Sequence, residues 1–135
     1  MSQSELVEID LGDKVRNFRF NQFDAMHVCE RLSQYPGMGT VSPLRILLLL
    51  GERHPRVWAE VLAEGFKGEE PNLKGERALR YFQDALQKYG KDVGDIAKQI
   101  RKAGELGSVW TKTDDEEEDA RGNGSTRSTT SKSTT

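Results

Sequence analysis

Apolar and polar residues alternate at the start of the chain, which is the pattern of a strand with one buried face. The Gly12-Asp13 pair that follows predicts a two-residue turn, because glycine accepts the positive φ that such turns require. We therefore expect a β-hairpin over residues 5–20. Its first strand places apolar side chains between acidic ones, in the order Val7, Glu8, Ile9, Asp10 and Leu11.

The return strand keeps this alternation only in its second half. Phe18 and Phe20 flank Arg19, but Val15 is out of phase with the two phenylalanines. This mismatch predicts a β-bulge or a slipped register near residues 16–17.

Apolar residues then recur every three or four positions, which is the pattern of amphipathic helices. Asn21, with Asp24 three positions later, predicts the start of the first helix. Ser42-Pro43 predicts the start of the second, with serine as the cap and proline in the first turn. The expected helices cover about residues 22–34, 43–66, 73–89 and 92–104.

The second helix is apolar on almost every side between residues 44 and 50. A helix of this kind is expected to be central and buried, with Leu47 and Leu48 in the core. Gly51 and the His-Pro pair at 54–55 are expected to break or kink the helix beyond this segment.

The composition changes abruptly after residue 111. Six acids form one run from Asp114 to Asp119, and nine of the eleven residues from Ser125 to Thr135 are Ser or Thr. Such a segment has almost no apolar surface to offset the entropy of ordering, so residues 112–135 are predicted to be disordered. The expected fold class is α+β, mainly α: a single domain over residues 1–111, in which an N-terminal two-stranded hairpin packs on about four helices, and a disordered C-terminal tail.

The charge balance argues against a strongly charged partner. Residues 1–111 carry 16 of the 20 Lys and Arg residues and 16 of the 22 Asp and Glu residues, so the body is formally neutral. A neutral body has no strong field to attract DNA or an anionic membrane. The longest apolar run, Ile46 to Leu50, is far shorter than the roughly 20 residues of a membrane span. No signal-peptide pattern precedes it, so we expect a soluble protein without a membrane partner.

No group of side chains has the spacing of a catalytic or metal site. His27 and Cys29 are two positions apart on an expected helix and do not share a face. His54 is distant in sequence, and Cys29 is the single cysteine, which excludes an internal disulfide and fits a reducing compartment. We therefore expect a protein that is not an enzyme and that uses no cofactor, metal or small-molecule substrate.

Basic residues along the last two expected helices leave a second interpretation open. A helix-turn-helix protein would use such residues to bind DNA, but acids such as Asp84, Asp92 and Asp95 are interleaved with them, which favours a solvated face of mixed charge. Nucleic acid is therefore not the expected partner, and a small DNA-associated helical protein is the first alternative. The basic residues are Arg77, Arg80, Lys88, Lys91, Lys98, Arg101 and Lys102.

Four large apolar residues are the candidate partner-binding residues. Trp58 and Trp110 are most simply core or edge residues, but large aromatic side chains also anchor interfaces. With Phe66 and Tyr81 they exceed what a four-helix body of this size needs.

The order of elements resembles the tail assembly chaperones of long-tailed bacteriophages and of gene-transfer-agent clusters. The resemblance spans about residues 5–105. In the hairpin, the resemblance rests on a short acidic strand, a Gly-containing turn and the sequence Asn-Phe-Arg-Phe at residues 17–20. Beyond the hairpin, it rests on an amphipathic helix from Phe23 to Leu32 and a leucine-rich helix from Leu44 to Leu50. The chain departs from the family pattern in the loop at residues 35–40.

The resemblance implies a non-enzymatic protein that binds the long helical tape measure protein before the tail tube polymerises around it. In many phages a longer, frameshifted product also engages the tail tube protein. The family further implies a location in the cytoplasm of the bacterial host and absence from the mature virion. A minor structural component of the virion tail or neck is the second alternative.

Overall fold

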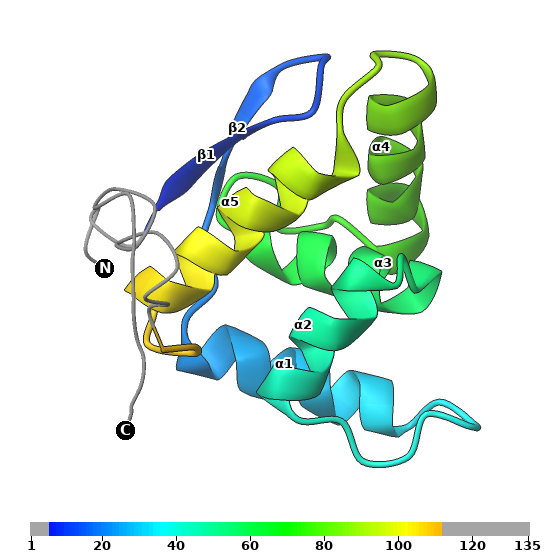
Figure 1. Cartoon of the computed structure of the whole chain (residues 1–135), viewed down its shortest axis with the longest axis vertical. Helices are drawn as coiled ribbons and strands as arrows, with labels where there is room; N and C mark the ends of the chain where they lie inside the picture. The colour runs from blue at the N-terminus through cyan, green and yellow to red at the C-terminus, as the bar shows by residue number, and fades with distance from the viewer. Residues whose placement is uncertain (1–5, 112–135) are drawn as a thin grey trace, which may run out of the picture.

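The computed structural model describes residues 6–111, and within them a two-stranded hairpin precedes five helices (Figure 1). The fold class is therefore α+β and mainly α, as the sequence predicts. The expected start of the hairpin at residue 5 and the expected disorder of residues 112–135 lie outside the described residues. The elements are β1 (Val7–Asp10), β2 (Val15–Phe18), α1 (Gln22–Ser33), α2 (Pro43–Gly51), α3 (Pro55–Gly65), α4 (Gly75–Gln87) and α5 (Val93–Leu106).

The hairpin is regular. β1 and β2 pair antiparallel in an unbroken register from Val7 opposite Phe18 to Asp10 opposite Val15. The two-residue turn is confirmed, with Gly12 at φ 101°. The predicted bulge is wrong, because the residue that breaks the alternation simply has its side chain on the other face: Val15 is 53% exposed.

Arg16 points to the inner face of the hairpin and is 3% exposed. The alternation of a half-buried strand would place an apolar residue at this position. The Arg16 guanidinium donates to Asp13 Oδ1 at 2.8 Å and to Glu70 Oε2 at 2.9 Å. It also lies over the Tyr81 ring, 4.3 Å from the centroid. A buried charge is tolerated only when it is paired in this way, so these acids are what allow an arginine on the inner face.

The expected helix over 43–66 is two helices, so five are present where about four were predicted. α2 ends at Gly51 and α3 begins at Pro55. Arg53 in the short connection has φ 60°, and proline at the first helical position lacks only an N–H that would have no partner there. The predicted break at Gly51 and residues 54–55 is confirmed.

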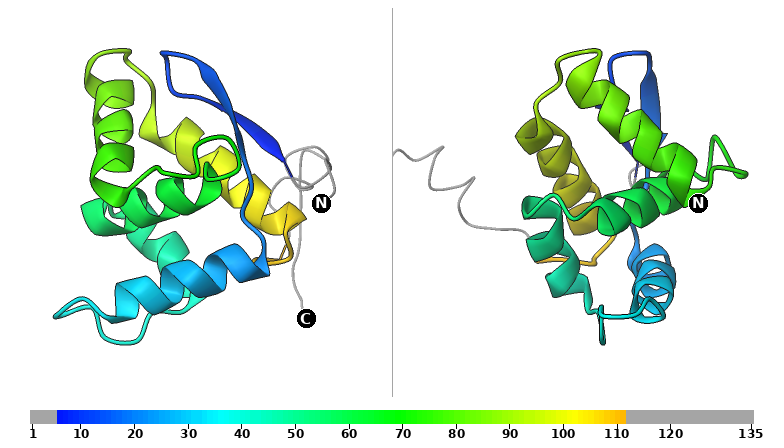
Figure 2. Two further views of the ribbon diagram at one scale, coloured as in Figure 1. Left: turned by 180° about the vertical axis from the view of Figure 1, so that it is seen from behind. Right: turned by 90° about the vertical axis from the view of Figure 1, so that its right-hand side faces the viewer.

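α3 is the central helix. Figure 2 shows it crossing the middle of the molecule, between α1 on one side and α4 on the other. Trp58 is fully buried, stacks on Phe82 with ring centroids 4.1 Å apart, and donates from Nε1 to Leu50 O at 3.0 Å. Phe66, just beyond α3, meets the Phe18 ring edge-on at 5.2 Å and so joins the hairpin to the helices.

α2 is not the central helix that its composition predicts. Ile46 and Leu50 are buried and Leu47 is partly buried, but Leu44 and Leu48 are 66% and 64% exposed. The centre is filled instead by α3 with its tryptophan, so α2 packs with one side only, against α1, α3 and α5. On its other side, Leu44 and Leu48 are exposed to solvent.

Candidate protein-binding site

The exposed side of α2 carries two large apolar side chains, Leu44 and Leu48. Leu44 and Leu48 are four positions apart, so they lie one turn apart on the same face. The helix is held firmly beneath them: Ser42 Oγ accepts from Arg45 N at 3.2 Å, Pro43 occupies the first turn, and Ile46 is fully buried. Two exposed leucines one turn apart on a capped helix form a small apolar patch, and such patches are candidate contact surfaces for a protein partner.

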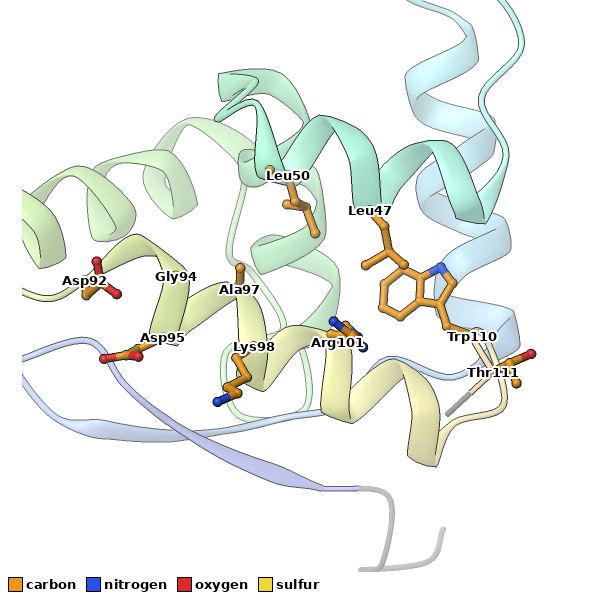
Figure 3. A pocket seen from close by; sticks show the side chains of 11 residues that line it. Leu47, Leu50, Asp92, Gly94, Asp95, Ala97, Lys98, Arg101, Trp110 and Thr111 are labelled. Carbon is orange, nitrogen blue, oxygen red and sulfur yellow. The ribbon is translucent and has the colours of Figure 1, made fainter. Parts of the chain in front are cut away.

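A groove of about 730 Å³ runs beside this face, between α2 and α5 (Figure 3). Leu47 and Leu50 extend from α2 towards α5, and Ala97 extends from α5 towards α2. Trp110 closes one end, where its Nε1 donates to Pro43 O at 2.9 Å and its ring stacks on Phe20 at 5.5 Å. The indole is therefore held in place by a hydrogen bond and by ring stacking, and it lines one end of the groove.

The charges that line the groove are ordered by sign along α5. Asp92 and Asp95 lie at the end remote from Trp110, and Lys98 and Arg101 lie between them and the tryptophan (Figure 3). Arg101 Nε donates to Glu105 Oε2 at 3.3 Å. Asp92, Asp95 and Lys98 make no ion pair within residues 6–111 and are exposed.

A second apolar depression of about 440 Å³ lies between α1 and the segment that follows α5. Met26 and Cys29 from α1 line it together with Pro43 and Val109. Phe23, also on α1, is 69% exposed and Met26 is 47% exposed. Pro43, which lines this depression, accepts the hydrogen bond of Trp110, which lines the groove.

The structure places the four sequence-predicted residues in different environments. Trp58 and Phe66 are completely buried in the core, so neither can contact a partner from this fold. Tyr81 is partly buried, and its hydroxyl donates to Glu70 Oε1 at 2.7 Å beside the hairpin. Trp110 is 8% exposed and is the one of the four that lines the groove.

The residues that sequence analysis missed are Leu44, Leu47 and Leu48. The sequence places them in the core, because a helix that is apolar all round is usually buried. The pair Ile46 and Leu50 and the pair Leu44 and Leu48 have the same four-residue spacing, so periodicity alone could not say which pair faces the core.

An ionic network joins α1 to α3 on another surface. Glu64, 5% exposed, accepts from Arg31 at 2.9 Å and contacts His27 at 3.2 Å, and it is also paired with Lys67. Burial alone would raise the pKa of the Glu64 carboxyl, but hydrogen bonds from Lys67, Arg31 and His27 outweigh it and lower the pKa to about 2. Glu64 is thus held ionised, and its satisfied bonds indicate a structural clamp.

The described residues offer little for bond chemistry. Within residues 6–111 no group of three or more His, Cys, Asp or Glu side chains could hold a metal ion. The pKa of the Cys29 thiol is raised by burial and by the nearby Glu30 charge, which lowers its thiolate fraction and its reactivity.

No helix in the described part of the chain is both long enough and apolar enough to span a bilayer. Comparison of the chain with protein-family models, with curated proteins and with solved structures finds no match.

Proposed function

We propose that this protein is a non-enzymatic tail assembly chaperone of a phage or prophage, which binds the tape measure protein in the cytoplasm of the bacterial host and is absent from the mature virion. The observation that carries the proposal is the exposed leucine face of α2 beside the groove between α2 and α5. The resemblance of residues 5–105 to tail assembly chaperones supplies the class of client.

The mechanism is the docking of an amphipathic client helix. Such a helix packs its apolar face into an apolar groove and is recognised through side chains three and four positions apart. Leu44 and Leu48 are about two-thirds exposed, and full burial of one leucine contributes about 1.5–3 kcal/mol. Covering both therefore contributes about 2–4 kcal/mol. While covered, the apolar face of the client helix cannot aggregate.

A co-purification experiment tests the proposal. The chain is expressed with the tape measure protein of the same gene cluster, and the complex is washed at low and at high salt. We expect capture that resists salt, because screening acts on exposed charges and leaves apolar burial intact. The double variant Leu44→Glu/Leu48→Glu should lose the client, since two carboxylates would have to be desolvated in the interface.

Val15→Glu is the control for placing a carboxylate at an exposed apolar position, because Val15 is 53% exposed on the hairpin. The control should capture the client as well as the unmodified chain does. Equal capture by the Leu44/Leu48 variant would refute the proposed binding face, and no capture by the unmodified chain would refute the proposed function.

The DNA-associated alternative is tested in the same buffers with duplex DNA. Two of the basic residues that suggested it, Lys91 and Arg101, are paired with Asp10 and Glu105. A mobility shift that disappears at high salt, without client capture, would favour that alternative. Recovery of the protein in purified particles would instead favour a minor structural tail or neck component.

A further inference from the structure

We draw no further inference here: the strongest candidate, the apolar depression between α1 and the segment that follows α5, with Phe23 and Met26 exposed on α1, carries none because nothing in the structure shows what covers it.

Discussion

Two residues on α2 have similar size and opposite surroundings, so replacing each with alanine should have very different effects on stability. Ile46 is fully buried, and Leu48 is 64% exposed. Ile46→Ala removes buried methyl and methylene groups and leaves a cavity, which costs about 2–5 kcal/mol. Leu48 loses only the third of its surface that folding covers, and alanine keeps its Cβ, so Leu48→Ala should cost about 0.5 kcal/mol or less.

Urea unfolding followed by tryptophan fluorescence measures both costs, because Trp58 is fully buried and becomes exposed on unfolding. The midpoint should fall strongly for Ile46→Ala and barely for Leu48→Ala, with the slope unchanged in both. A cost above about 2 kcal/mol for Leu48→Ala would mean that this residue is buried. In that case the exposed face of α2, and the binding site built on it, would be wrong.

Three further predictions concern close packing, charge and the C-terminal segment. A Cβ on Gly65 would lie 1.9 Å from the Phe18 ring, so Gly65→Ala should destabilise by about 1–3 kcal/mol; Gly68→Ala, whose Cβ would meet nothing within 4 Å, should not, and equal thermal melts would refute this. The pKa of Glu64 is lowered to about 2 from 4.5, so its stabilisation is complete above pH 4.5 and is lost as the pH falls towards 2. Glu64→Gln should flatten that part of the stability–pH curve, and an unchanged curve would contradict the ionic clamp. A chain that ends at Lys112 should melt at nearly the same temperature as the full chain, because the removed sequence lacks apolar anchors, and a loss of many degrees would refute this.

The sequence predicted the elements well because their signals are local. The capping box at Asn21 and Asp24 is present as expected, with both of its hydrogen bonds formed. Gly12 suits the turn because glycine tolerates the positive φ that the turn requires. Proline suits the start of α3 because the first residue of a helix needs no partner for its N–H. None of these features depends on which other element lies nearby.

The errors arose where the environment of a residue depends on distant parts of the chain. Arg16 is buried because Glu70, 54 positions later, supplies a carboxylate, and no pattern within the strand reports this. α2 has the most continuous apolar sequence of the helices but lies on the outside, because α3 brings Trp58 against Phe82 and fills the centre. For the same reason Trp58, one of the candidate anchors, is buried, and Leu48, which was expected in the core, is exposed.

Hydrogen exchange of the free protein and of its complex with the tape measure protein tests the central claim most directly. The account predicts slower exchange on binding over residues 43–51 and 93–106, which form the two sides of the groove, and no change over residues 75–87 of α4. Slower exchange confined to α4 or to the hairpin, with residues 43–51 unchanged in a stable complex, would contradict it.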